Sequence, residues 1–255
     1  MKDFFSALSV AFSMYSRIPM PQAEWNKKTM RFALLFFPLV GAVVAAVLYG
    51  VFLLFRQFSL SPVFFASAGV FIPVMITGGI HLDGYCDTCD ALAAHGDRAD
   101  RLRIMKDPHV GAFGVIYTVA VLLIQFGAWH QLYIKPKYLI AAFACFVLSR
   151  VLAALAIVNF TKAKESGLAA TFSGYSSKTA LTVSLIILAA VATLVSALCG
   201  LPGLLVPATS LLVFTLLYRM AKRQFGGITG DLAGFYITVC ETLALCVSAV
   251  LGAIV

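Results

Sequence analysis

Long apolar segments alternate with short polar segments along most of the chain. Seven of the apolar segments approach the length, roughly 20 residues, that a helix needs to cross a membrane. They lie near 33–55, 61–80, 110–128, 138–158, 179–199, 203–218 and 231–253. This pattern predicts an all-α fold, a polytopic transmembrane helical bundle of about seven spans. No linker or internal repeat divides the chain, so we expect residues 1–255 to form a single integral membrane domain.

The segment 3–20 precedes the first span and has a different pattern. Its serines fall on one helical face and its aromatic residues fall mostly on the other. Such a pattern is typical of a helix that lies at the membrane interface or against the bundle. No small-residue cleavage site follows, so we expect an N-terminal interfacial helix that is retained rather than a signal peptide.

Composition and charge agree with the hydropathy pattern. Hydrophobic residues make up 61% of the chain and charged residues 12%, whereas about a quarter of the residues of a soluble domain are charged. Short cytoplasmic loops collect Lys and Arg, and with the N-terminus inside, fifteen of the 19 basic residues fall on the cytoplasmic side. Those fifteen are Lys2, Arg17, Lys27, Lys28, Arg31, Arg98, Arg101, Arg103, Lys106, Lys162, Lys164, Lys178, Arg219, Lys222 and Arg223. The net charge of +8 follows from this bias and calls for membrane lipid and a phosphorylated substrate as partners, not nucleic acid.

Six of the eleven acidic residues lie between positions 83 and 107, just after the second apolar segment. An acid placed in hydrocarbon costs roughly 2.5 to 3.5 kcal/mol, so a cluster at the membrane boundary needs a partner. On a helix that continues from the second span, Asp83, Asp87 and Asp90 would share an arc of about 60°. Three such carboxylates predict a site for a hard divalent cation, Mg²⁺ above all. The alternative is a solvated acidic face on a cytoplasmic loop.

Basic residues follow the acidic stripe, between Arg98 and Lys106. Acids that hold a metal beside bases that hold phosphate are typical of phosphoryl transfer, so we expect 81–109 to be a cytoplasmic catalytic segment. His81 is either a base beside the metal or a hydrogen-bonded structural residue. A zinc site of Cys86, Cys89 and nearby histidines is a weaker interpretation, because a lone C-x-x-C is a weak signal.

A second polar group opens the last apolar segment. Its glycines, in the run 226–231, suggest a cradle of backbone N–H groups for an anion, whereas Asp231 alone would suit a helix N-cap. Glu241 would lie about three turns into the membrane, where an ionisable side chain is a functional candidate. Arg150, inside the fourth span, would pair either with Glu241 or with a substrate phosphate.

These motifs resemble those of the cobalamin synthase family, the adenosylcobinamide-GDP ribazoletransferases. The run Gly78-Gly79-Ile80-His81-Leu82-Asp83-Gly84, with Asp87 and Asp90, is similar to the family's G-G-x-H-x-D-G-x-x-D-x-x-D. The segment 104–114 is similar to its I-M-K-D-S-R-x-G-x-x-G, and 226–231 to its G-G-x-T-G-D. The chain departs from the family at Ala91, where glycine is usual, and at Pro108 and His109, which replace Ser-Arg.

The resemblance implies a membrane transferase of cobalamin biosynthesis. It would move the phosphocobinamide moiety of adenosylcobinamide-GDP to α-ribazole or α-ribazole 5′-phosphate, with Mg²⁺ as cofactor and GMP as the other product. The expected catalytic residues are His81, Asp83, Asp87, Asp90 and Lys106, the three aspartates being the metal ligands. The expected substrate-binding residues are Arg101, Arg103, Asp107, His109, Gly226, Gly227, Thr229, Asp231 and Glu241.

The resemblance also implies a place in the cell, the bacterial inner membrane, and the distribution of basic residues predicts that the active site faces the cytoplasm. A homo-oligomer, or contact with other enzymes of the corrinoid pathway, is a further expectation. Two other functions would also use membrane aspartates. A CDP-alcohol phosphotransferase would show D-G-x-x-A-R, but Asp87-Thr88 stand at the Ala-Arg positions. A divalent-cation transporter would place its acids near the bilayer midplane.

Overall fold

The structure is a computed structural model that describes residues 2–163 and 178–254. Lys164, one of the basic residues used for the topology, lies outside them. The described elements are helical: α1 (Lys2–Tyr15), α2 (Lys27–Gln57), α3 (Pro62–Thr77), α4 (Ile80–Ala93), α5 (Arg98–Ile104), α6 (Ala112–Ile134), η1 (Pro136–Tyr138), α7 (Leu139–Asn159), α9 (Lys178–Ala197), α10 (Leu201–Met220), η2 (Ala221–Phe225) and α11 (Gly230–Ile254).

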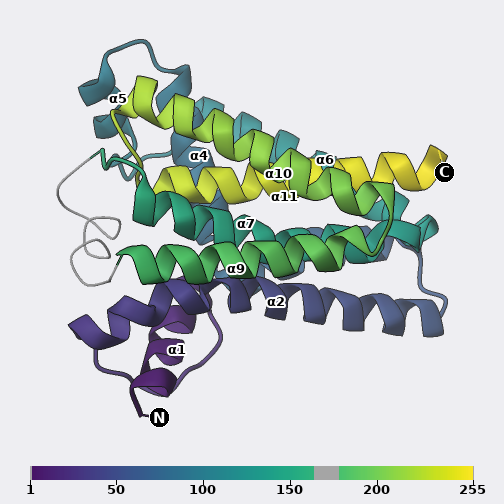
Figure 1. Cartoon of the computed structure of the whole chain (residues 1–255). Coiled ribbons are helices and arrows are strands. Elements are labelled where there is room, and N and C mark those ends of the chain that lie inside the picture. Colours follow the sequence, from purple (N-terminus) through teal and green to yellow (C-terminus); the bar gives the residue numbers. More distant parts are fainter. Residues whose placement is uncertain (1, 164–177, 255) are drawn as a thin grey trace.

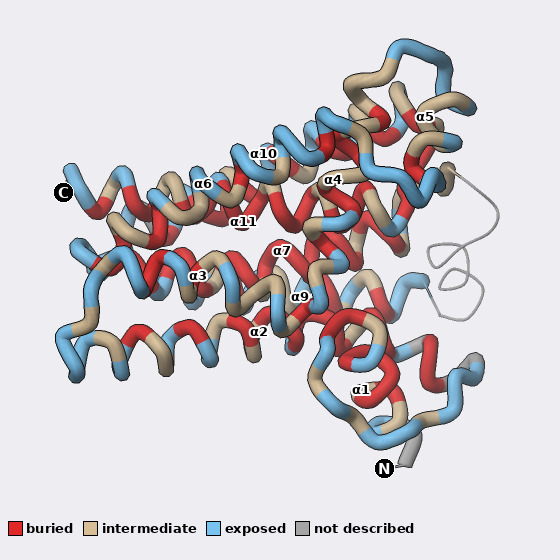
Figure 2. Tube along the Cα trace, turned by 180° about the vertical axis from the view of Figure 1, so that it is seen from behind, coloured by how far each residue is buried: buried red, intermediate tan, exposed pale blue. Residues whose placement is uncertain are grey.

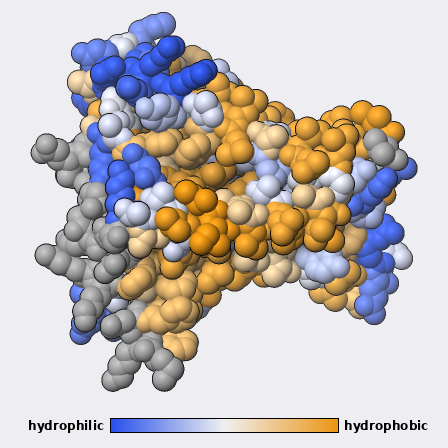
Figure 3. Space-filling model, in the orientation of Figure 1, coloured by the Kyte–Doolittle hydropathy of each residue, from blue (hydrophilic) through white to orange (hydrophobic). Residues whose placement is uncertain are grey.

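Long apolar helices run side by side through the body of the molecule (Figure 1). In the described residues six helical stretches are long and apolar enough to cross a membrane, and the number is seven if the bent pair of α3 and α4 is counted as one span. Hydrophobic residues cover the middle of the visible face, and hydrophilic residues gather toward its ends (Figure 3). The predicted all-α polytopic bundle of about seven spans is confirmed.

The sequence suggested a helix that continues from the second span into the acidic segment, but the structure has a bend between them. Helix α3 ends at Thr77 with Gly78 as its C-cap, α4 starts after Gly79, and the two helices are bent by 95°. Both glycines have positive φ, 67° and 77°, in the left-handed region that side chains with a Cβ avoid. The double glycine therefore turns α4 and its aspartates away from the axis of the span.

The N-terminal helix is shorter than the expected 3–20 and packs against α2. It ends at Tyr15 because Pro19 disfavours helix at the preceding residue and the Ser16 hydroxyl is used locally. Ser16 Oγ donates to the carbonyl of Phe12 at 2.7 Å and accepts from the N–H of Ile18 at 3.3 Å. The chain then leaves α1 along the end of α3.

Helices α7 and α11 form the centre of the bundle. Helix α11 packs against α4, α6, α7 and α10, and α7 packs also against α2 and α9. Buried residues run along both central helices (Figure 2). The site described below lies where α4 crosses the start of α11.

Candidate active site

Helix α4 is held very close to the start of α11 by two glycines. A Cβ built on Gly84 would lie 2.7 Å from the carbonyl oxygen of Asp231, and one on Gly234 would lie 3.0 Å from that of His81. Thr238 Oγ1 also donates to the His81 carbonyl, at 3.2 Å. The close approach explains the glycine after Asp83 in the sequence motif, because a larger residue there would push the helices apart.

This contact brings a fourth carboxylate to the acidic stripe. The half-buried Asp87 lies within electrostatic range of Asp83, Asp231 and Asp90. Asp231 is not the N-cap of α11, since Thr229 Oγ1 accepts from the N–H of Leu232 at 3.1 Å instead. Four acids from two helices therefore share one small region, which favours a bound cation.

Asp90 has a positioning task within this group. Its Oδ2 accepts from the N–H of Gly111 at 2.8 Å and its Oδ1 from the N–H of Gly114 at 2.8 Å. These are free donors at the first turn of α6, and a carboxylate is favourable there. A side chain at either glycine would collide with the Asp90 carboxylate. The two glycines of the G-x-x-G motif thus let the Asp90 carboxylate bind the start of α6, and this contact holds α6 against α4.

The other two predicted metal ligands are differently placed. Among the described residues, no donor is recorded for the side-chain oxygens of Asp83 or Asp87. Over the same ranges, no group of three or more His, Cys, Asp or Glu side chains is arranged to hold one ion. Mg²⁺ commonly uses one or two carboxylates and completes its shell with water and substrate phosphate, so Asp83 and Asp87 fit it as a pair. The predicted site of three aspartates stays a prediction.

A cavity of about 620 Å³ opens beside Asp83. It is lined by the end of α1, the α3–α4 bend, the first turns of α4 and Thr118 of α6. Its volume is that of a small-molecule site. A smaller space, about 90 Å³, lies on the inner side, between His81, Asp83 and Asp231. The Nε2 atom of His81 is buried and has no hydrogen-bond partner in the described residues.

The basic residues of the segment 98–106 are exposed apart from the half-buried Arg101. Arg103 pairs with Asp100 at 3.0 Å between Nη2 and Oδ1, and Lys106 is exposed. His109 donates its backbone N–H to Asp107 Oδ1 at 2.9 Å, which holds the pKa of that carboxyl below its usual range. None of the predicted residues Arg101, Arg103, Lys106, Asp107 and His109 lines either cavity described above.

In the glycine run before α11, the first backbone donors are used within the protein, and the expected anion cradle stays a prediction. The N–H of Gly227 donates to the Ala221 carbonyl at 3.0 Å, and that of Ile228 donates to Thr161 at 2.7 Å. A Cβ on Gly227 would collide with the backbone of Lys162 and Ala163. Gly227 thus lets two loops pair closely, and the N–H groups of Gly227 and Ile228 already have acceptors within the protein.

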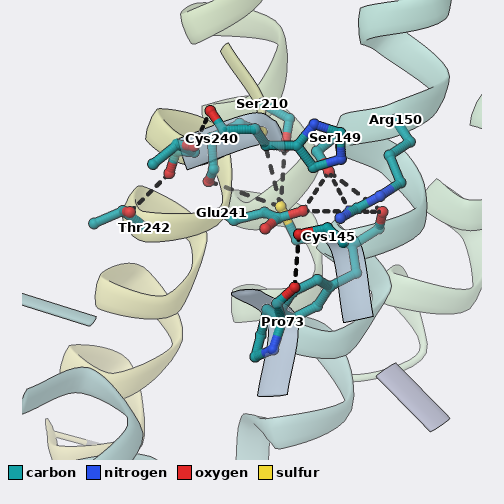
Figure 4. Close-up of polar contacts among 12 residues, drawn as sticks. Pro73, Cys145, Ser149, Arg150, Ser210, Cys240, Glu241 and Thr242 are labelled. Atoms are coloured by element: carbon teal, nitrogen blue, oxygen red, sulfur yellow. Dashed lines mark hydrogen bonds and ion pairs between the residues drawn. The ribbon is translucent and has the colours of Figure 1, made fainter. Parts of the chain in front are cut away.

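Glu241 and Arg150 form an ion pair in the middle of the bundle. Figure 4 shows Ser149 and Arg150 of α7 beside Glu241 of α11. Arg150 Nη1 and Ser149 Oγ both donate to Glu241 Oε1, the latter at 2.8 Å, and Arg150 Nη1 also donates to the Phe146 carbonyl at 2.7 Å. Arg150 is only 1% exposed. Of the two pairings considered for Arg150, the structure contains the one with Glu241, and Glu241 lines neither cavity described above.

Comparison with known proteins assigns the chain to a family. A family model described as cobalamin-5-phosphate synthase matches residues 7–249. The chain belongs to the cobalamin-5-phosphate synthase family. A protein of Lachnoclostridium phytofermentans named adenosylcobinamide-GDP ribazoletransferase is 41% identical over 94% of this chain and 92% of its own length. Proteins of the same name from Clostridium botulinum (Alaska E43) and Geobacillus kaustophilus are each 32% identical, over 96% and 95% of this chain and 97% and 95% of their own lengths. No solved structure matches the chain.

For this member of the cobalamin-5-phosphate synthase family, sequence reasoning missed three features of the site. It grouped Asp231 with the substrate-binding residues and not with the acidic stripe, it treated Asp90 only as a metal ligand and catalytic residue, and it gave Arg17 no role in the site. Arg17 lines the large cavity. The motif glycines at 84, 111 and 114 carried a usable signal, because glycine is the residue used where the backbone must approach another group closely.

Proposed function

We propose that this protein is a magnesium-dependent adenosylcobinamide-GDP ribazoletransferase that works at the cytoplasmic face of the bacterial inner membrane. It joins phosphocobinamide to α-ribazole or α-ribazole 5′-phosphate and releases GMP, which assembles the nucleotide loop of cobalamin. Membership of the family and the names of the relatives support the reaction. The charge bias of the loops supports the cytoplasmic side.

The observation that carries this proposal is the group of four acids beside the large cavity. Asp83 lines the cavity, and Asp87 lies within electrostatic range of Asp83, Asp231 and Asp90. A diphosphate cannot approach such a group unless a cation neutralises it. Magnesium held by Asp83 and Asp87 would supply that neutralisation and polarise the phosphoryl oxygens.

The chain's own residues then have distinct tasks. Asp90 fixes α6 against α4, and Gly84 keeps Asp231 beside the stripe. The 3′-hydroxyl of α-ribazole attacks the cobinamide-side phosphorus, a new P–O bond forms, and the bond to the GMP phosphate breaks. The hydroxyl proton passes to a carboxylate of the group or to His81, whose Nε2 has no partner in the described part of the chain.

The same observations bear on the two alternative functions. In a cation transporter the acids should lie along a path through the bundle, but the acid in its middle, Glu241, is paired with Arg150. A CDP-alcohol phosphotransferase would need the D-G-x-x-A-R motif that the chain lacks. Family membership favours the ribazoletransferase over both.

The test is GMP release from adenosylcobinamide-GDP by the purified protein in detergent. Release that requires α-ribazole and is abolished by chelating Mg²⁺, with formation of the cobalamin product, is the expected result. Release without Mg²⁺ would refute the metal dependence alone. If well-folded protein releases no GMP, the reaction is wrong, and CDP-alcohols become the next substrates to try.

A further inference from the structure

Arg17 lines the active-site cavity from the loop that follows α1. Its backbone N–H donates to the carbonyl of Ile76 at 2.7 Å, which ties the end of α1 to the end of α3. Its side chain lies over Gly78: a Cβ built there would be 2.5 Å from Arg17 Nε and 2.8 Å from Arg17 Cγ. Gly78 therefore both turns the chain and makes room for the arginine.

The charge of Arg17 is not balanced by any of the residues that the structure describes. In the ranges that the structure describes, no ion pair or side-chain hydrogen bond is recorded for its guanidinium, and the residue is exposed. Among the described residues that line the 620 Å³ cavity, Arg17 and Asp83 are the charged ones. The cavity thus has a cation on the wall next to α1 and a carboxylate on the α4 wall, and its lining also includes Ser and Thr side chains.

We propose that Arg17 binds the diphosphate of the donor nucleotide, opposite the metal-binding acids. This inference rests on the proposed function, and it assigns the binding of the donor diphosphate to the wall of the cavity that contains Arg17. Guanidinium presents a planar set of donors that matches phosphate oxygens, and a phosphate is the group that would meet both a cation and a metal-bridged carboxylate. Arg17 then takes the task that the sequence gave to Arg101, Arg103 and Lys106, which do not line the cavity.

A lipid phosphate has the same chemistry and is the competing source, because Arg17 lies next to an interfacial helix. The experiment separates the two by measuring kinetics in a phosphate-free maltoside detergent and in liposomes that contain anionic lipid. The variants are Arg17→Gln and Arg17→Lys. Arg219→Gln is the matched control, since Arg219 is exposed, belongs to the same predicted cytoplasmic side and does not line the cavity.

In detergent, Arg17→Gln should raise the KM for adenosylcobinamide-GDP about ten- to hundred-fold, the loss expected for a hydrogen bond to a charged group. The KM for α-ribazole, which has no phosphate, should not change, and that unchanged value also shows that the variant is folded. Arg17→Lys should keep part of the affinity, and Arg219→Gln should behave as the wild type. The dissociation constant of GDP, measured directly with Mg²⁺ present, should rise in parallel with the donor KM.

Three results would overturn the inference: an unchanged donor KM in Arg17→Gln, an equal rise of the KM for both substrates, or an effect confined to anionic liposomes. The last would assign Arg17 to lipid. An inactive wild type would refute the proposed function instead. The comparison of GDP binding by wild type and Arg17→Gln would then still decide whether Arg17 holds the diphosphate.

Discussion

Two regions of this protein place ionisable groups in an apolar molecule, and they treat charge in opposite ways. In the middle of the bundle, Glu241 is matched by Arg150 and Ser149, and both charges are buried. At the α4–α11 crossing, acids lie near one another beside a cavity, and the nearby cation Arg17 has no recorded partner among the described residues. Removing one partner of a buried ion pair leaves an uncompensated charge, whereas like charges held close together repel one another unless a cation neutralises them.

The largest effect should come from removing charge at the unbalanced site. Asp87→Asn keeps the shape of the side chain, and we expect it to abolish turnover, a loss of roughly 10³-fold, while the protein stays folded in the membrane. GMP release measures the first effect and thermal unfolding in detergent the second. Asp100→Asn, in the exposed pair with Arg103, is the control and should stay near wild-type activity. Normal turnover in Asp87→Asn would refute the metal-binding role of the stripe.

Changes at the Arg150–Glu241 ion pair should lower the free energy of unfolding. Arg150→Ala leaves the Glu241 carboxylate buried without its cation, which costs about 3–5 kcal/mol. Replacing both residues by Met should cost clearly less than the sum of the two single changes, because no lone charge remains. Denaturation of the purified variants measures this. If Arg150→Ala unfolds like the wild type yet loses donor binding, the pair belongs to the active site and the contrast between the regions is wrong.

The next prediction tests the close packing of α4 against α11 at the acidic site. Gly84→Ala places a methyl group 2.7 Å from the Asp231 carbonyl oxygen, so α4 and α11 must separate, at a cost of about 1–3 kcal/mol. We expect lower activity and a lower unfolding temperature. Gly127→Ala is the matched control, because nothing lies within 4 Å of its Cβ position. Equal behaviour of the two variants would contradict the close packing.

The smallest effect should come from changing the exposed pair of Asp107 and His109, which lies between α5 and α6. The pKa of Asp107 is lowered first by the backbone N–H of His109, and this donor survives in His109→Ala. A lowered pKa in the folded state adds stability above the unfolded value, and this is lost as the pH falls through the folded value. The pH dependence of unfolding should therefore hardly change in His109→Ala. A clear loss of donor affinity instead would place His109 in the substrate site.

Much of the architecture follows from local sequence patterns. Apolar runs of membrane length predict the spans, since each helix must satisfy its own backbone in lipid. The stripe of Asp83, Asp87 and Asp90 follows from helical periodicity alone. The bend at Gly78 and Gly79 could also have been predicted, because consecutive glycines commonly end a helix.

Tertiary structure decided what the polar residues do. Asp90 caps a helix that begins more than twenty residues later, Asp231 joins the stripe from the last helix, and Arg17 enters the cavity from the first. The pairing of Glu241 with Arg150 likewise depends on the packing of α11 against α7. The sequence by itself determined the helices and the chemistry available on each, because periodicity and hydropathy act within one segment. The tertiary structure alone decides which charged side chains pair with one another and which face the cavity, because this depends on contacts between segments that no local pattern encodes.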